Sequence, residues 1–514
     1  MGPEKVIPLH EFDTMPVYPN MVLTLMLKYD KVLDPLVLRD SLIELVSRDG
    51  WYKLGARLKR NEKGKLVYHV PAKFDEKTPA ITFSHALYDM DVEEHHLGCK
   101  IPAHQPDKPS VMADPSVFDS LARRADAPKG LEDFIKRALP QLELHVVSFR
   151  NATVVNLSCL HSVLDGMSFG RQGLFYGWML VLQGRQAEIP PVCGFDVDLL
   201  KNLGKQPSEQ HKFHHLRMSG LGMLWWMFKR TLQMVWYKEE ARIVCVPGEF
   251  VEQLREAALD DLAKGSTQNG KAEGEAGAKP WVSEGDVLVA WWTRYATMHL
   301  RNQPNKTINV SSAYNIRRVL SGNLLPAGHF YLSNASLGLF MLPKIRDIFE
   351  RPLSWLASQM RQAIVETGTK AQIEALVAEV MPDWTRPSTF RMLGDSGMHM
   401  LVFSNWTQAQ FYQVDLAPAA ADKADRESGQ PVVPSFISFR VTSSVWPMRD
   451  TFCIIGKDAE ENYWLGGTLQ KGLWAKMENE FQQGVSLALE RLRAVVGCFF
   501  MRQNIGPALL HYQL

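Results

Sequence analysis

The stretch NLSCLHSVLDGMSFG, from Asn156 to Gly170, ends an apolar run with a histidine and places an aspartate four residues later. The residues before the histidine, 153–160, are rich in β-branched and apolar side chains and predict a buried strand. Gly166 permits a tight turn, and the apolar residues after it predict a helix. A strand, a sharp turn and a helix present a side chain at the end of a sheet, where active sites tend to form. The pattern therefore singles out His161 and Asp165.

The spacing of the pair does not select it, because HALYD places His85 and Asp89 at the same separation, and the chain holds 15 histidines. The surroundings of His85 are acidic, and no glycine follows Asp89. A histidine at the end of a strand is also found as a core residue that a backbone partner satisfies. Local context alone leaves both interpretations of His161, a catalytic base and a core residue, open.

The composition limits the class of protein. A chain of 514 residues exceeds the usual size of a single core, so two domains are expected. Apolar residues at 46% and charged residues at 22% are ordinary for a soluble globular protein. A formal net charge of +1 argues against nucleic-acid binding. The 6 cysteines lie far apart without a CxxC pair, which indicates reduced thiols and no metal site. The N-terminus lacks the pattern of a secretory signal, so we expect a cytoplasmic protein.

Helices and strands alternate along the chain, which predicts a mixed α/β fold. Two amphipathic helices are predicted at 36–48 and 281–299, the second with Ser283 as its N-cap. Residues 143–150 and 152–160 predict a hairpin. Further strand-like runs are 307–316, 399–406, 411–417, 434–443, 450–458 and 462–470. We expect an N-terminal domain at 1–220, a connecting segment at 221–263 and a C-terminal domain at 264–514.

The connecting segment holds a run dense in Trp, Met and Leu. Residues 221–237 read LGMLWWMFKRTLQMVWY, with only Lys229 and Arg230 as charges. The run is too short and too interrupted to span a bilayer. We predict a helix buried between the domains; a helix lying on a membrane surface is the alternative.

HSVLDG resembles the HxxxDG signature of the BAHD acyl-CoA-dependent acyltransferases. Further segments resemble that family in the same order: 36–58, 281–296, AYNIRRVLSGNLLPAGHFYLSNAS at 313–336, VFSNWTQAQFYQVDLA at 402–417, and YWLGGTL at 463–469. The resemblance implies two chloramphenicol-acetyltransferase-like domains, each a mixed sheet flanked by helices, with the active-site channel between them. It also implies acyl-CoA as co-substrate and no permanently bound cofactor.

The chain departs from the family in one block. The DFGWG sequence of the family is reduced to Asp415, Leu416 and Ala417, which resembles divergent fungal members such as the trichothecene acetyltransferase group. In the family this block lies away from the reacting centre, so its loss bears on the use of CoA more than on catalysis. Leu160 stands where peptide-synthetase condensation domains usually carry a second histidine, which favours a free-standing enzyme that uses CoA.

Acyl transfer from a thioester needs a base for the acceptor's proton and donors for the oxyanion. A neutral histidine titrates in the right range, and we assign the role of base to His161. No activated serine or cysteine nucleophile is evident, so direct attack in a ternary complex is expected. The resemblance implies that Asp165 turns away and pairs with an arginine, either Arg317 or Arg318, as a brace. Gly166 is expected to serve the turn, whether Asp165 orients the imidazole or braces the loop.

The resemblance of SNW to the family's Ser/Thr-x-Trp suggests Trp406 as oxyanion donor through its indole N–H, with Ser404 as the second donor. Ser283 is a weaker candidate for contact with CoA. The aromatic content of 398–411 suggests an apolar pocket for the acceptor.

The expected function is transfer of an acyl group, acetyl or longer, from acyl-CoA to a hydroxyl or amine of a specialised metabolite by a monomer. One alternative is a condensation-like or cyclising enzyme that uses a carrier-bound or non-CoA substrate. The altered block at 415–417 suggests another, a catalytically silent binding protein.

Overall fold

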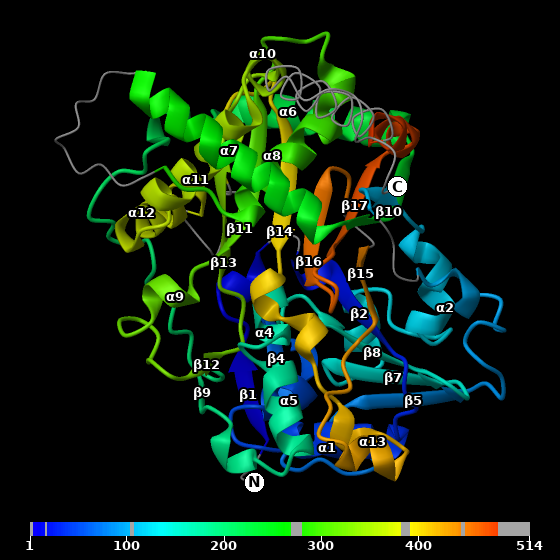
Figure 1. Ribbon diagram of the computed structural model, residues 1–514. Coiled ribbons are helices and arrows are strands. Elements are labelled where there is room, and N and C mark those ends of the chain that lie inside the picture. Colours follow the sequence, from blue (N-terminus) through cyan, green and yellow to red (C-terminus); the bar gives the residue numbers. More distant parts are fainter. Residues whose placement is uncertain are drawn as a thin grey trace, which may run out of the picture.

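The computed structural model describes residues 4–15, 18–102, 107–268, 280–381, 391–443 and 448–481. Figure 1 shows two halves, one above the other, each built on its own sheet with helices packed against it. The mixed α/β fold with two chloramphenicol-acetyltransferase-like halves is confirmed.

The first sheet carries the motif strand at its centre. Its order is β15-β2-β8-β7-β5, with β8 antiparallel to both neighbours. The bounds are β2 (Met21–Tyr29), β5 (Thr82–Leu87), β7 (Leu142–Ser148), β8 (Thr153–Leu160) and β15 (Phe436–Ser443). Every residue of β8 is buried, as its continuous apolar run predicts for a central strand. The predicted hairpin is confirmed, because Ser148 pairs with Thr153 across its turn.

Two helices cover the core of the first half. They are α1 (Pro35–Val46), which begins at the capping side chain of Asp34, and α5 (Leu174–Leu182). Trp178 of α5 is fully buried, and its indole N–H donates to Ser41 of α1 over 2.8 Å. The predicted helix at 36–48 is therefore confirmed.

The second sheet has the order β13-β11-β14-β16-β17-β10-β6. Its strands are β6 (Ser110–Val111), β10 (Glu239–Val246), β11 (Ile308–Asn315), β13 (Ser336–Met341), β14 (His399–Asn405), β16 (Thr451–Lys457) and β17 (Tyr463–Gln470). Helices α7 (Gly248–Gln268), α8 (Glu284–Thr297) and α11 (Leu353–Thr367) cover one face of it. The predicted capping box of α8 is present, with Ser283 and Asp286 bonded reciprocally.

Shorter elements complete the described part of the chain. The helices are α2 (Asp119–Ala122), α3 (Leu131–Lys136), α4 (Gly166–Phe169), α9 (Arg317–Leu320), α10 (Ile345–Glu350), α12 (Lys370–Val380) and α13 (Lys423–Glu427). The strands are β1 (Lys5–Pro8), β3 (Arg57–Arg60), β4 (Leu66–Val70), β9 (Val192–Cys193) and β12 (Phe330–Tyr331).

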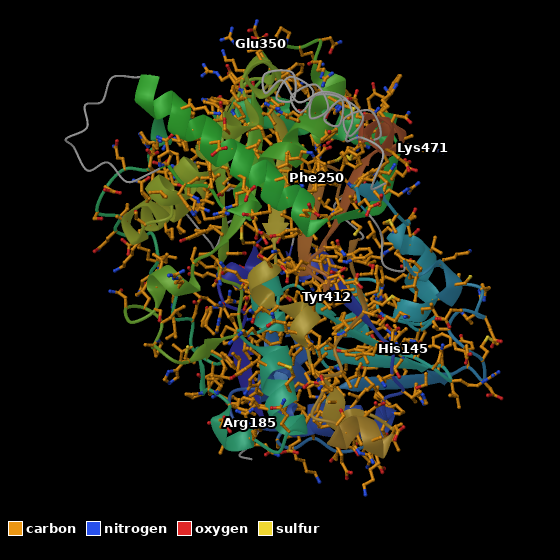
Figure 2. All side chains as sticks on the ribbon, viewed as in Figure 1. His145, Arg185, Phe250, Glu350, Tyr412 and Lys471 are labelled. Carbon is orange, nitrogen blue, oxygen red and sulfur yellow. The ribbon has the colours of Figure 1, made fainter. Side chains whose placement is uncertain are left out.

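Two strands cross the expected domain limits. β6, from the first part of the chain, pairs with β10 at the edge of the second sheet. β15, from the last part, pairs with β2 in the first sheet. Buried residues between 406 and 437 belong to the core of the first half, and Tyr412 lies near the centre of the molecule (Figure 2). Each half therefore contains a segment from the other; the limits at 1–220 and 264–514 stay predictions.

The strand predicted at 411–417 is wrong. The chain forms short 3-10 turns there, at Phe411–Gln413 and Ala417–Ala419. The carboxylate of Asp415 accepts hydrogen bonds from the backbone N–H groups of Ala417 and Val432, over 2.9 and 2.8 Å. These local bonds compete with a strand ladder, as aspartate side chains do in turns.

The position predicted for the Trp-rich helix is also wrong. Helix α6 (Gly220–Trp236) forms, but it lies on the surface, and Trp226 is its one buried side chain. Periodicity predicts an apolar stripe on such a helix, but it does not say whether the stripe faces the protein.

Candidate active site

His161 follows β8 directly and is held from three sides. Its backbone N–H donates to the carbonyl of Met21 on β2 over 2.8 Å. Its carbonyl accepts from the side-chain amide of Asn334 over 2.7 Å. The imidazole stacks on the ring of Tyr18, with 4.0 Å between ring centroids and 6° between planes. Tyr18 therefore orients the ring, while Met21 and Asn334, from different halves, hold the backbone of His161.

The surroundings keep the imidazole neutral. Burial lowers the pKa of His161 below its usual value, and this effect exceeds the opposing ones of its own backbone carbonyl, the charge of Asp165 and the amide of Asn334. Nδ1 is buried and has no hydrogen-bond partner of normal geometry among the described residues. An imidazole that stays neutral can take a proton, which is what a general base requires.

Asp165 is used by the fold rather than by the imidazole. As N-cap of α4 it accepts from the backbone N–H of Ser168 over 3.0 Å, within a capping box. Its second oxygen accepts from the N–H of Ala335 over 3.0 Å and lies 2.9 Å from the guanidinium of Arg317. Burial alone would raise the pKa of Asp165, but Arg317 and the backbone donors hold it below its usual value. The carboxylate thus stays charged and bound.

Arg317, and not Arg318, is the partner that the structure places beside Asp165. The Arg317 guanidinium also donates to the carbonyls of Tyr331 and Ser333, over 2.8 and 2.6 Å. Arg318 is exposed. Because Arg317 stands in α9 and Asp165 at the N-cap of α4, their pair ties the motif loop to the other half.

A buried polar cluster of Asp13, Lys53 and Ser333, which the sequence did not reveal, holds Asn334 in place. The carboxylate of Asp13 accepts from both the backbone N–H and the side-chain amide of Asn334, over 2.9 and 2.8 Å. Lys53 lies 3.3 Å from the same carboxylate and donates to Ser333 over 2.8 Å. Asn334 lies in the 313–336 segment, but neither Asp13 nor Tyr18 carries a sequence signal, since both are distant from the motif.

Gly166 allows Trp406 to approach the motif. A Cβ at Gly166 would lie 2.3 to 2.7 Å from indole atoms of Trp406, and 2.4 Å from Nε1. Any side chain there would displace the indole. The Nε1–H forms no hydrogen bond with other described residues, so the structure leaves a free donor beside the turn that follows His161.

Ser404 and Ser283 lie in different settings. Ser404 of β14 pairs in register with Cys453 of β16, so both side chains point to the face of the second sheet opposite α8. The Ser283 hydroxyl donates to Asp286 over 2.7 Å and accepts from Arg361 over 2.8 Å. That hydroxyl is used by the N-cap of α8, and its contact with CoA stays a prediction.

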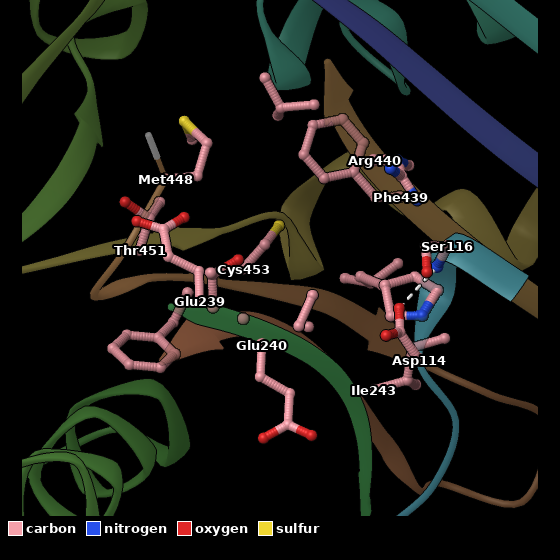
Figure 3. A pocket seen from close by; sticks show the side chains of 18 of the residues that line it. Asp114, Ser116, Glu239, Glu240, Ile243, Phe439, Arg440, Met448, Thr451 and Cys453 are labelled. Atoms are coloured by element: carbon pink, nitrogen blue, oxygen red, sulfur yellow. Dashed lines mark hydrogen bonds between the residues drawn. The ribbon is translucent and has the colours of Figure 1, made fainter. Parts of the chain in front are cut away.

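A cavity of about 580 Å³ lies between the second sheet and β15. Its apolar walls include Ile243, Phe439, Val441, Met448 and Ile455. Figure 3 shows Phe439 of β15 on one side of this space and Cys453 and Glu239 on the other. The residues that line this cavity include none from 398–411, where the sequence predicts an apolar pocket for the acceptor; Met398, His399 and Met400 line a second, smaller pocket beside α6.

The cavity adjoins the motif through two aromatic rings. Phe439, on the cavity wall, contacts Trp406 edge to face with 4.2 Å between ring centroids. Trp406 in turn lies over Gly166. The strand register also places β15 near the motif. Ser443, at the end of β15, pairs with Met21, whose carbonyl accepts from the backbone N–H of His161. A substrate in the cavity would therefore lie on the Trp406 side of the catalytic loop.

Cys159 does not act as a nucleophile. Its side chain is fully buried in β8, and burial raises the pKa of the thiol well above its usual value. A reactive cysteine needs a lowered pKa and access.

The fold and the site together define a transferase of the two-domain chloramphenicol-acetyltransferase type. The chain belongs to the Transferase family, whose model matches residues 132–418, more than half of its length. The resemblance to the BAHD acyltransferases is thereby confirmed.

Curated relatives are similar over nearly the whole chain. A Penicillium decumbens protein named transcriptional regulator calD is 35% identical over 488 residues, which cover 93% of this chain and 96% of that protein. A Penicillium rubens protein named acetyltransferase adrJ is 34% identical over 488 residues, which cover 93% of this chain and 95% of that protein. Among solved structures, F. graminearum TRI101 complexed with coenzyme A and T-2 mycotoxin has a TM-score of 0.64 at 11% identity. The match covers 92% of this chain and 96% of that one. At that identity the likeness shows the fold.

The brace role of Asp165 predicts a loss of stability on Asp165→Asn. The substitution leaves the charge of Arg317 buried without its partner, which typically costs about 3–5 kcal/mol. The folded pKa lies below the unfolded value of about 3.9, so the stabilisation is complete at neutral pH and is lost as pH falls through the folded pKa. Urea unfolding at neutral pH and near pH 3 measures both effects.

Asp89→Asn is the matched control, since Asp89 holds the same place in the second HxxxD sequence and its side chain is 97% exposed. Its change in unfolding free energy should stay within about 0.5 kcal/mol. Equal losses in the two variants would contradict the brace.

Proposed function

We propose that the protein transfers an acyl group from acyl-CoA to a hydroxyl of a specialised metabolite, with His161 as general base. The observation that carries the proposal is the neutral, oriented imidazole of His161, whose neighbouring carboxylate is already bound to Arg317. Membership of the Transferase family and the name of adrJ, an acetyltransferase, support it.

In the proposed reaction the acceptor hydroxyl gives its proton to Nε2 of His161 while its oxygen attacks the thioester carbonyl. A tetrahedral oxyanion forms. The C–S bond then breaks, and the imidazolium returns the proton to the departing thiolate of CoA. Since the buried thiol of Cys159 supplies no nucleophile, the acyl group passes directly between the two substrates.

Trp406 is proposed as the donor to the oxyanion, because its indole N–H bonds none of the described residues and lies beside the turn that follows His161. Ser404 is proposed as a second donor on the ground that it points to the same face as Cys453, which lines the cavity.

The cavity of about 580 Å³ is proposed for the acceptor, and its volume falls within the range of about 300–1,000 Å³ for small-molecule sites. Its walls are mostly apolar. Three acidic residues (Asp114, Glu239 and Glu240) and three basic ones (Lys238, Arg440 and Lys471) also line it, so its charges balance and the assignment to the acceptor rests on the apolar walls.

Two curated relatives carry the name of a transcriptional regulator. The formal net charge of +1 and the base built into the motif loop favour transfer for this chain. The carrier-dependent and silent-binding alternatives have no comparable support in the site. A monomeric state and a cytoplasmic location stay predictions.

Loss of the base is the first test. His161→Ala should lower turnover roughly 10²–10⁴-fold, the usual contribution of a general base. His85→Ala is the matched control, since His85 starts the second HxxxD sequence and bonds Ser148 over 3.0 Å. Turnover is followed by free thiol released from acetyl-CoA in the presence of a metabolite extract, with mass spectrometry of labelled products. Full turnover in His161→Ala would refute the mechanism.

The pH profile of the wild type gives a second test of His161 as a neutral general base. Because burial lowers the pKa of His161, kcat/KM should remain high at pH 6.5 and fall only at lower pH. An acid limb centred above pH 6.5 would contradict a neutral, half-buried base.

Trp406→Phe should lower kcat roughly 10²-fold or more, as expected for loss of one oxyanion donor, with little change in the KM for acetyl-CoA. Trp178→Phe controls for the loss of a large indole, since Trp178 is also buried but lies against Ser41 in the first core. Similar kcat values for the two variants would show that the Trp406 N–H plays no part in catalysis.

Gly466→Ile tests the assignment of the cavity. A Cβ at Gly466 meets no other residue within 4 Å, so the side chain extends into the cavity without strain. The KM of the acceptor found by that mass spectrometry should rise roughly tenfold or more, as expected when about 1.4 kcal/mol of binding is lost. A rise in the KM for acetyl-CoA alone would assign the cavity to the donor.

A further inference from the structure

Helix α6 presents its apolar side to solvent. Along the helix the exposed positions recur at the spacing of one helical face. They are Leu221, Leu224, Trp225, Phe228, Leu232, Val235 and Trp236, with exposures between 48% and 81%. The stripe spans 16 residues, about 24 Å at 1.5 Å per residue. A contiguous exposed apolar surface of this kind marks a site of interaction.

The opposite side of α6 is fastened to the protein by polar contacts. The guanidinium of Arg230 forms an ion pair with Asp450 over 2.8 Å. The indole N–H of Trp226 donates to the carbonyl of Met398 over 3.3 Å. Arg449 donates to the carbonyls of Gln233 and Tyr237 at the end of the helix. The orientation of the stripe is therefore fixed by the fold.

The charges on the helix favour an anionic partner. Residues 219–238 include no Asp or Glu. Lys229 lies over the ring of Trp225, 4.9 Å from its centroid, and Lys238 follows the helix as an exposed cation. Tryptophan rings flanked by lysine are typical of helices that lie in the headgroup region of a bilayer.

The length of α6 excludes a transmembrane helix. None of the helices in the described part of the chain is long and apolar enough to cross a bilayer. An amphipathic helix of 17 residues with one apolar face can instead lie in the plane of the interface.

Helix α6 also ends at the rim of the acceptor cavity. Lys238 and Glu239, directly after the helix, line that cavity. Met448 lines it too, and it precedes Arg449 and Asp450, the two residues that hold α6. A surface bound to the stripe would thus lie close to the cavity.

We propose that α6 docks the protein on the surface of an anionic lipid bilayer, with its apolar stripe inserted among the headgroups. An apolar acceptor dissolved in the membrane then reaches the cavity without crossing bulk water. This second step rests on the proposed function of the cavity, whereas the docking itself does not.

Flotation of the full-length protein with vesicles tests the docking without any substrate. The wild type should float with vesicles of phosphatidylcholine and phosphatidylserine, and less with phosphatidylcholine alone or in high salt. Trp225→Glu combined with Phe228→Glu should lower the bound fraction roughly tenfold or more, because two inserted side chains are lost. Leu87→Glu combined with Val365→Glu is the matched control, since both positions are exposed and apolar.

Trp225→Phe combined with Trp236→Phe keeps the stripe apolar and gives a second readout. This variant should still float, while the quenching of tryptophan fluorescence by brominated lipid, seen in the wild type, is lost. Failure of the wild type to float would overturn the proposal. If the wild type instead forms a dimer in sedimentation, and Trp225→Glu with Phe228→Glu abolishes it, the stripe is an interface between copies. Both results leave the proposed transfer reaction unaffected.

Discussion

The buried ion pair between Asp165 and Arg317 is the interaction on which the site depends. It joins the N-terminus of α4 in the first half to α9 in the second, at 2.9 Å. The pair holds the carboxylate of Asp165 on Arg317 and the backbone donors, and the remaining charge of Asp165 raises the pKa of His161 less than burial lowers it. The histidine can then be oriented by stacking on Tyr18 and by Asn334, and it stays neutral. One ion pair thus serves both the assembly of the halves and the basicity of the site.

Gly166 of the motif allows a second contact between the two halves. Because Gly166 lacks a Cβ, the indole of Trp406 from the second half can lie against the loop of the first half. Trp406 also contacts Phe439, on the strand β15 that the second half contributes to the first sheet. Exchange of strands therefore brings the candidate donor, the cavity wall and the base together.

The local parts of this arrangement could be predicted from the sequence. The strand before His161, the cap of α8 and the hairpin at Arg150–Asn151 depend on residues close in the chain, and all formed as predicted. The choice of Arg317 over Arg318, and the contributions of Tyr18 and Asp13, depend on contacts between residues far apart in the chain. The 411–417 segment looked like a strand because its apolar residues are indeed buried, but Asp415 bonds the backbone into turns.

Helix α6 shows why amphipathicity alone does not place a helix. The sequence pattern gives a stripe of large apolar side chains, and burial of such a stripe is the usual outcome because it removes apolar area from water. Here the polar side of the helix makes the specific bonds: Arg230 to Asp450, and the carbonyls of Gln233 and Tyr237 to Arg449. These partners lie more than two hundred residues away, so their effect is absent from any local window. Because Arg230 and the carbonyls on one side of α6 are bonded inward, the apolar stripe on the other side faces outward, where we propose that a partner outside the folded core binds it.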